Sequence, residues 1–97
     1  MELITSDQFE WDLEKNEINK EKHKIAFEDA IELFDAPFLR FRSDRSGEIR
    51  WVTLGKAQGR VIAVIHTEGE GRIHIVSARV ARTKEREIYQ ERIGDTC

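Results

Sequence analysis

Apolar residues recur at helical spacing in the part of the chain that precedes Pro37. Four of them between positions 27 and 34 follow the pattern i, i+3, i+4 and i+7, which predicts a helix with one apolar face. The helix should end before Pro37, because the residue before a proline disfavours helical backbone. An earlier helix is predicted from residue 13 to about residue 24, with Asp12 as its N-cap. The aromatic pair in 9–11 favours a short strand before it.

The pattern changes to strands after Pro37. The run 60–67 is rich in Val and Ile on both faces, which predicts a central strand. Other strands are expected at 38–42, 49–54 and 72–78, with a loop at 43–47, turns at 55–59 and 68–71, and a charged helix at 83–92. The predicted fold is α+β: two N-terminal helices packed on an antiparallel sheet of about four to five strands, with a C-terminal helix.

Composition narrows the class of protein. The 97 residues, of which 36% are charged and 39% hydrophobic, fit a single domain over 1–97. The longest apolar run, 61–65, is too short to cross a bilayer, and the first four residues lack the features of a signal peptide. The single cysteine, Cys97, excludes a disulfide framework and is expected to be an exposed thiol without a role. These features predict a cytoplasmic protein that does not bind membranes.

Charge is divided unevenly along the chain. Residues 1–48 carry 7 basic and 13 acidic residues, a net charge of −6, whereas residues 49–97 carry 9 basic and 6 acidic residues, a net charge of +3. Such a division indicates a polarised surface that could hold an anion. Ordinary solvated charge explains it equally well, and on charge alone it is the simpler interpretation.

Basic residues are concentrated between positions 72 and 86, which hold five of them and one acid. Arginine presents a planar fork of donors that suits phosphate oxygens. Basic side chains at strand ends and at a helix start could converge on one face of the sheet, as in RNA-binding domains. The alternative is a set of surface ion pairs with the acidic first half.

The first predicted helix carries four polar residues on one face. Lys15, Asn19, Lys22 and His23 follow the spacing i, i+4, i+7 and i+8. A solvated face explains this arrangement without a function. His23 lies at the predicted C-terminus of the helix, where the dipole favours an imidazolium. A capping or packing role and a chemical role both remain open for it.

Two further histidines, His66 and His74, are separated by a predicted tight turn and are expected to be cross-strand neighbours. Without a third ligand they make a weak metal site, so neither a metal nor a cofactor is expected. The chain contains no P-loop, nucleophile elbow or dinucleotide-binding glycine motif. Arginines with a histidine do fit RNA cleavage by attack of the 2′-hydroxyl on the adjacent phosphate, whose transition state gathers negative charge.

The order and spacing of several short segments resemble the BrnT family, the toxins of BrnT/BrnA type II toxin–antitoxin systems. The similarity spans about Phe9 to Gln90. It rests on the residues 9–12, Lys15, Asn19, Lys22, His23, the helix 27–34, Gly55, Gly59, Arg60, the following Val/Ile strand with Thr67, Arg72, 75–79, Ala81, Glu85, Arg86 and Tyr89. Three positions depart from the family pattern, with Lys24 where glycine is frequent, Ala26 where a capping residue is frequent, and His66 where an aromatic residue is frequent.

This resemblance implies a RelE-like fold and an endoribonuclease that cuts RNA and stops translation. It implies a dimer bound by a BrnA-type antitoxin, with DNA contacted only through that antitoxin. The resemblance places Arg60 and Arg79 near the scissile phosphate, and it matches Lys22, His23, Arg72 and Ser77 to family positions. On the toxin hypothesis, His23 is a candidate general acid or base. RNA binding is expected from Lys22, Arg72, Ser77, Arg82 and Lys84.

Two other functions remain open at this point. The chain could be a partner-binding domain that keeps the fold without the activity, or a general nucleic-acid binder with strongly salt-dependent affinity. Growth arrest on expression without a partner would favour the toxin. If the toxin interpretation holds, the basic face should receive an acidic segment of the antitoxin.

Overall fold

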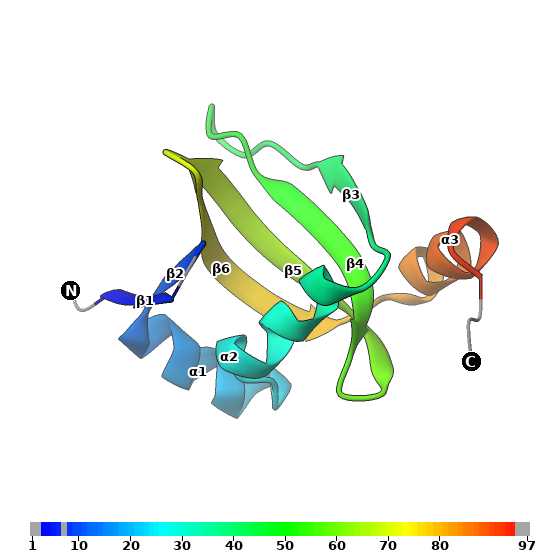
Figure 1. Ribbon diagram of the computed structural model, residues 1–97, viewed down its shortest axis with the longest axis horizontal. Coiled ribbons are helices and arrows are strands. Elements are labelled where there is room, and N and C mark those ends of the chain that lie inside the picture. The colour runs from blue at the N-terminus through cyan, green and yellow to red at the C-terminus, as the bar shows by residue number, and fades with distance from the viewer. Residues whose placement is uncertain (1–2, 7, 95–97) are drawn as a thin grey trace.

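The computed structural model describes residues 3–6 and 8–94, and the side chains from residue 8 onward; Cys97 lies outside this range. The fold is α+β, as predicted, with a six-stranded sheet in the order β1-β2-β6-β5-β4-β3 (Figure 1). The strands are β1 Leu3–Ser6, β2 Phe9–Asp12, β3 Leu39–Arg42, β4 Trp51–Ala57, β5 Arg60–Gly69 and β6 Arg72–Val80. The helices are α1 Leu13–His23, α2 Phe27–Ala30, the 3₁₀ helix η1 Ile31–Asp35, and α3 Thr83–Arg92.

The antiparallel meander from β3 to β6 is confirmed, but the prediction of a purely antiparallel sheet is wrong. β2 pairs with β6 in parallel, and β1, which was not predicted, pairs with β2. The parallel pair arises because α1, α2, η1 and the meander separate β2 from β6 in the chain. A local pattern cannot reveal such a long-range pairing.

The two N-terminal helices begin and end close to the predicted positions. Asp12 caps α1, and its Oδ1 accepts a hydrogen bond from the Lys15 N–H at 3.0 Å. The predicted second helix is α2 continued by η1. Ala26 provides no side-chain cap for α2. Instead, Asn16 Oδ1 accepts from the Phe27 N–H at 2.8 Å, so α1 satisfies the first donor of α2.

The turns of the meander are tighter than predicted. They consist of Gln58–Gly59 and Glu70–Gly71, and φ is positive at both residues of each pair, which is the backbone twist that two-residue hairpins favour. Gly55, predicted in a turn, lies inside β4. A Cβ atom at Gly55 would meet Leu33 Cβ at 3.0 Å, so glycine lets η1 pack closely on the sheet.

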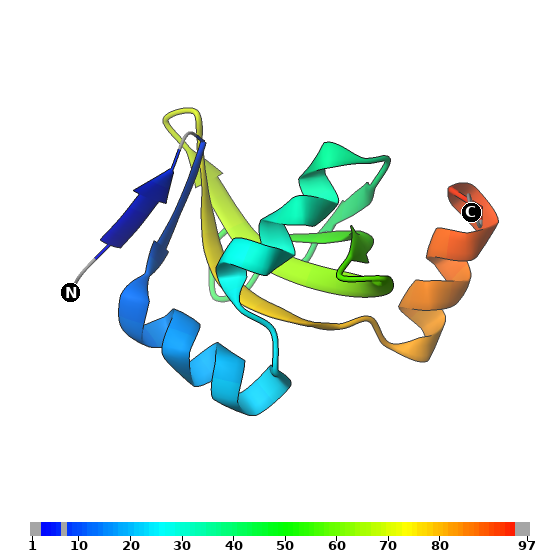
Figure 2. The same cartoon turned by 60° about the horizontal axis from the view of Figure 1, so that its bottom comes forward.

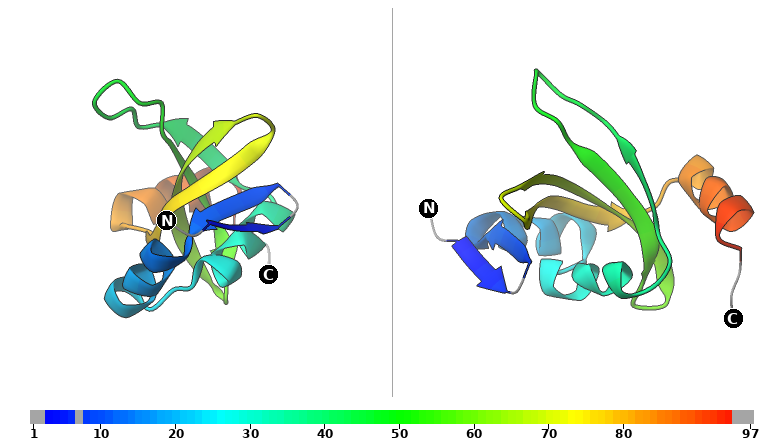
Figure 3. Two further views of the ribbon diagram at one scale, coloured as in Figure 1. Left: turned by 90° about the vertical axis from the view of Figure 1, so that its left-hand side faces the viewer. Right: turned by 45° about the horizontal axis from the view of Figure 1, so that its top comes forward.

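Each face of the sheet has its own apolar core. α1, α2 and η1 cover one face, here called the α1–α2 face, where Trp11, Phe27, Leu33, Ile62 and Ile75 are buried (Figure 2). The opposite face, the α3 face, buries Val52, Leu54, Val61 and Ala63 against Tyr89 of α3. α3 covers only one end of its face, because it lies at the far end of the molecule from β1 (Figures 1 and 3).

A β-bulge in β6 changes which side chains reach the α3 face. Ile65 pairs with Ser77 and His66 pairs with Ile75, so Val76 is an extra residue without a partner on β5. The bulge places Ser77 on the same face as His74, three residues earlier. His66 faces the other side, so the prediction that it neighbours His74 across the turn is wrong: Thr67 pairs with His74.

The connection between β3 and β4, residues 43–50, extends beyond the rest of the sheet as a long loop (Figure 3). An isolated bridge between Arg45 and Glu48 closes its tip. Among the described residues, no helix has the length and apolar character needed to span a membrane.

Candidate functional site

The part of the α3 face that α3 leaves uncovered is a cleft with a volume of about 460 Å³. Its apolar lining comes from Val52, Ile65 and Val76, and two serine hydroxyls, from Ser43 and Ser77, also line it. The remaining lining residues, among those the structure describes, are all basic: Lys22, His23, Arg45, Arg50, Arg79 and Arg82. The cleft therefore combines a small apolar surface with a rim of positive charge, which suits a polyanion that also carries flat apolar groups.

The C-terminal end of α1 supplies Lys22 and His23. Asn19, one turn earlier, is buried and bonds the open edge of β6. Its Nδ2 donates to the Ala78 carbonyl at 2.8 Å and to the Ile25 carbonyl at 2.9 Å. Its Oδ1 accepts from the Ala78 N–H at 3.2 Å. The interpretation of this face as solvated does not hold for Asn19, because its amide takes the place of a neighbouring strand beyond the end of β2.

Ser77 and Arg79 enter the cleft from β6. The Ser77 hydroxyl donates to Asn19 Oδ1 at 3.3 Å, which links this strand to the end of α1. Arg79 donates from Nη1 and Nη2 to the Glu85 carboxylate at 2.7 and 3.0 Å. Hydrogen bonds from the Arg79 guanidinium lower the pKa of the Glu85 carboxyl below its usual value, so this pair is ionised at neutral pH.

The cations of the cleft differ in whether they already have a partner. Arg79 is paired with Glu85, and Arg50 Nε donates to Glu48 at 2.7 Å. Within the described part of the chain, the side chains of Lys22, Arg45 and Arg82 make no hydrogen bond or ion pair. These three cations are therefore available to an incoming anion.

Sequence reasoning missed Arg45 and Arg50. Both belong to the loop before β4, a region that was interpreted only as loop and the start of a strand. These two arginines line the cleft together with residues of β5 and β6, so they reach a site built mainly from the second half of the chain. The pairing of Val52 with Ile65 is the long-range contact that brings the two arginines to the cleft. In the sequence, the only signal for them was weak: two arginines that flank a glycine-containing turn.

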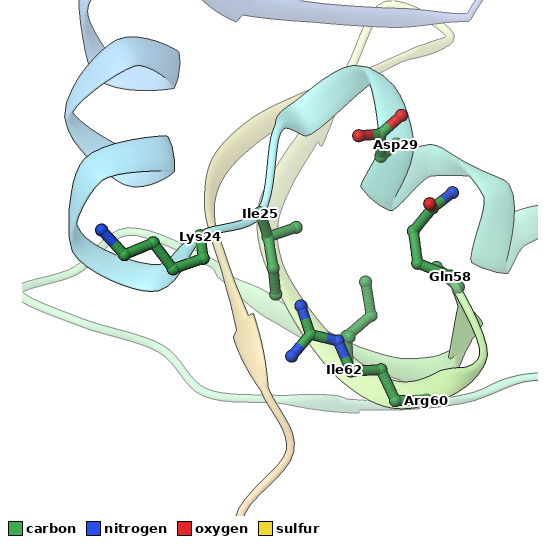
Figure 4. Close-up of a pocket in the computed structure, with 7 residues that line it drawn as sticks. Lys24, Ile25, Asp29, Gln58, Arg60 and Ile62 are labelled. Carbon is green, nitrogen blue, oxygen red and sulfur yellow. The ribbon is translucent and has the colours of Figure 1, made fainter.

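Arg60 is not brought together with Arg79. Arg60 starts β5 on the α1–α2 face, because it alternates with Ile62, whereas Arg79 pairs with Ala63 on the α3 face. Arg60 lines a separate pocket of about 130 Å³ between the α1–α2 connection and the β4–β5 turn. Figure 4 shows its guanidinium beside Ile25 and Ile62. The catalytic role assigned to it stays a prediction.

Arg72 and Lys84 lie outside the cleft as well. Arg72 shares the α3 face but is at the opposite end of β6, where it lines a second hollow with Glu10 and His74. His74 Nδ1 and Glu10 Oε2 are 3.1 Å apart there. Lys84 is exposed on the first turn of α3. Five of the eight residues selected from the sequence line one cleft: Lys22, His23, Ser77, Arg79 and Arg82.

His66 is buried, and its polar contacts are with residues of the sheet that do not line the cleft. Its Nε2 shares a hydrogen bond of 2.6 Å with Thr53 Oγ1, and its Nδ1 lies 3.5 Å from Glu68 Oε2. Burial lowers its pKa from 6.5 to about 4, so the ring is neutral at pH 7. The described residues contain no group of three or more His, Cys, Asp and Glu side chains that could hold a metal ion.

Comparison with known proteins bears on the family of this chain. No curated protein matches the chain. A family model described as the ribonuclease toxin BrnT of type II toxin–antitoxin systems matches residues 11–85, a range that includes all five residues selected from the sequence that line the cleft. The match covers more than half of the chain, so this protein belongs to the BrnT family of ribonuclease toxins.

Proposed function

We propose that this protein is an endoribonuclease that cuts RNA in the basic cleft without a metal ion. The observation that carries the proposal is the lining of the cleft, to which the described part of the chain contributes six basic residues and no acid. Membership of a ribonuclease toxin family supports it. The apolar residues Ile65 and Val76 give bases a surface to lie against while the rim binds phosphates.

The proposed reaction is an internal transesterification. The 2′-oxygen of a ribose attacks the neighbouring phosphorus, a 2′-O–P bond forms, and the bond from phosphorus to the 5′-oxygen breaks. A proton leaves the 2′-hydroxyl and a proton reaches the 5′-oxygen. Arg79 would stabilise the charge that gathers on the phosphate oxygens, and His23 would transfer one of the two protons.

The other cations of the cleft would hold the RNA backbone. The side chains of Lys22, Arg45 and Arg82 make no hydrogen bond or ion pair among the described residues, although Arg82 acts electrostatically on Glu85, so each can replace a counterion on a phosphate. Affinity should therefore fall steeply with salt. Ser77 would donate or accept beside them, while binding by Arg72 would require RNA to extend along β6 to its other end.

The same charge pattern supports neutralisation by a BrnA-type antitoxin. A type II toxin has an antitoxin partner, and an acidic segment with apolar side chains would cover both the basic rim and the apolar floor of this cleft. The same proposal includes a homodimer of this protein within the toxin–antitoxin complex, which contacts DNA only through the antitoxin. A charge-reversed antitoxin segment should bind far more weakly, and equal binding would argue against this docking.

The deciding experiment is cleavage of an end-labelled RNA by purified protein, without ribosomes and with a chelator present. Arg79→Ala should fold and fail to cut. Arg92→Ala, an exposed arginine on the last turn of α3, is the matched control and should cut normally. Arg60→Ala, measured beside them, tests the role that the resemblance assigns to that residue.

Each result distinguishes a function. Cutting by the wild type and by Arg92→Ala but not by Arg79→Ala supports the proposal. Cutting that the chelator abolishes would reject the metal-independent reaction. Cutting that appears only when ribosomes are added would restrict the substrate to RNA on the ribosome. Salt-dependent binding of RNA and DNA without any cutting would instead identify a binding domain.

A further inference from the structure

The ion pair between Arg79 and Glu85 is the best-defined polar contact of the cleft. Both ends of the guanidinium are used, with Nη1 at 2.7 Å and Nη2 at 3.0 Å from the two carboxylate oxygens. The side chains are only 17% and 14% exposed. A bidentate pair fixes the plane of an arginine as well as its position, so Arg79 cannot rotate freely in the cleft.

Glu85 is itself held in place by the start of α3. Its Oε1 also accepts from the Arg82 N–H at 2.8 Å, as the third residue of a helix does in a capping box. The segment before the helix is fixed too, because the Arg86 guanidinium donates to the Ala81 carbonyl at 2.7 Å. Further along the helix, Tyr89 is buried on the α3 face. The carboxylate therefore belongs to a rigid element rather than to a mobile side chain.

This arrangement leaves a defined part of Arg79 for a ligand. Nη1 and Nη2 are engaged by Glu85, whereas Nε–H has no acceptor among the described residues. Arg79 with Glu85 carries no net charge, so the pair adds little to the long-range attraction of a polyanion. Lys22, Arg45 and Arg82 can supply that attraction. The pair is better suited to orient one donor at a fixed position than to increase affinity.

We infer that Glu85 is a positioning residue, which holds the Arg79 guanidinium so that its free edge meets the scissile phosphate. This inference rests on the proposed function of the cleft. The loss of Glu85 should therefore lower kcat and leave KM nearly unchanged. KM should not rise, because removing the carboxylate increases the positive charge of the cleft.

The test uses Glu85→Gln, which keeps an oxygen for the Arg82 N–H but loses the bidentate ion pair. We expect kcat to fall at least tenfold, with KM within twofold of the wild-type value. Glu87→Gln is the matched control, because Glu87 is exposed on the same helix and lies outside the cleft. Its kcat should equal that of the wild type. Circular dichroism at the assay temperature shows whether each variant is fully folded.

A double-mutant cycle separates positioning from a general structural effect. If Glu85 acts through Arg79, Glu85→Gln should have little further effect in an Arg79→Lys background, because lysine cannot form the bidentate pair. Additive losses in the two backgrounds would overturn the inference. A higher kcat for Glu85→Gln would also overturn it, since Glu85 would then be a lock that occupies Arg79.

A spectroscopic measurement keeps this test independent of cleavage. The Arg79 Nε–H resonance of ¹⁵N-labelled protein should shift when a short RNA with a 2′-deoxy sugar at the cleavage position is added. The shift should be lost in Glu85→Gln. An unchanged shift in that variant rejects the positioning role alone, whereas no shift and no cutting with the wild type rejects the proposed function as well.

Discussion

Asn19 offers the sharpest test of how α1 is attached to the sheet. It is buried, and its amide bonds the Ala78 N–H, the Ala78 carbonyl and the Ile25 carbonyl. Asn19→Leu has nearly the same size and removes every one of these bonds. The variant therefore leaves one donor and two acceptors without a partner in the interior.

The size of the effect follows from those three groups. An orphaned buried donor or acceptor costs about 1–3 kcal/mol, so three cost roughly 3–9 kcal/mol. Leucine recovers about 1–2 kcal/mol by burying more apolar surface. We expect a net loss near 4 kcal/mol. A domain of this size has a free energy of unfolding of about 5–15 kcal/mol, so the variant should be marginally stable.

Urea unfolding followed by far-UV circular dichroism measures this loss directly. Glu21→Gln is the control, because Glu21 lies on the exposed side of the same helix. Its free energy of unfolding should stay within about 0.5 kcal/mol of the wild-type value. A loss below about 1 kcal/mol for Asn19→Leu would refute the reasoning. It would show that water or a shifted backbone satisfies Ala78 and Ile25.

Two further predictions concern His66 and Lys24. The pKa of His66 is lowered by burial to about 4, so the unfolded chain binds a proton that the folded chain does not. The free energy of unfolding should be at its full value above about pH 6.5 and fall by roughly 3 kcal/mol as the pH decreases to 4. Urea unfolding across that range measures this slope, and His66→Tyr should remove the part that His66 contributes. An unchanged slope in that variant would contradict the prediction. Lys24 ends α1 with φ at 61°, so Lys24→Gly should raise the unfolding free energy by up to about 1 kcal/mol. Lys24→Ala, which removes the same charge but keeps the strained φ, should not, and equal midpoints for the two variants would refute the argument.

Local patterns predicted the elements of this fold well. Asp12 as the cap of α1, the apolar stripe 27–34 and the Val/Ile run of β5 each depend on residues that are close in sequence, and all three are confirmed. Lys24 adopts the left-handed conformation that glycine adopts most readily, and glycine is the residue that the resemblance to the family pattern leads us to expect there. Such features could be predicted because short-range backbone sterics and side-chain periodicity determine them.

Burial and pairing could not be predicted in the same way. From the sequence, Asn19 cannot be distinguished from a solvent-exposed asparagine on a helix. It is buried because its amide bonds the open edge of β6. Arg45 and Arg50 reach the cleft through the pairing of β4 with β5. The parallel contact of β2 with β6 joins residues 64 positions apart, such as Phe9 and Ile73. None of these depends on a periodicity that the sequence displays.

The register of β6 explains why the arginine set divides as it does. Side chains alternate along a strand, so Arg72 and His74 would lie opposite Ser77 and Arg79 if β6 were regular. The extra residue, Val76, reverses the alternation and brings all four to the α3 face. β5 has no such extra residue between Arg60 and Ile65, so Arg60 stays on the other face. Membership of one face, rather than distance along the chain, therefore determines which basic residues can act on a common substrate. In this protein the bulge at Val76 sets that membership for the residues of β6, and the amide of Asn19 ties the end of α1 to the same strand.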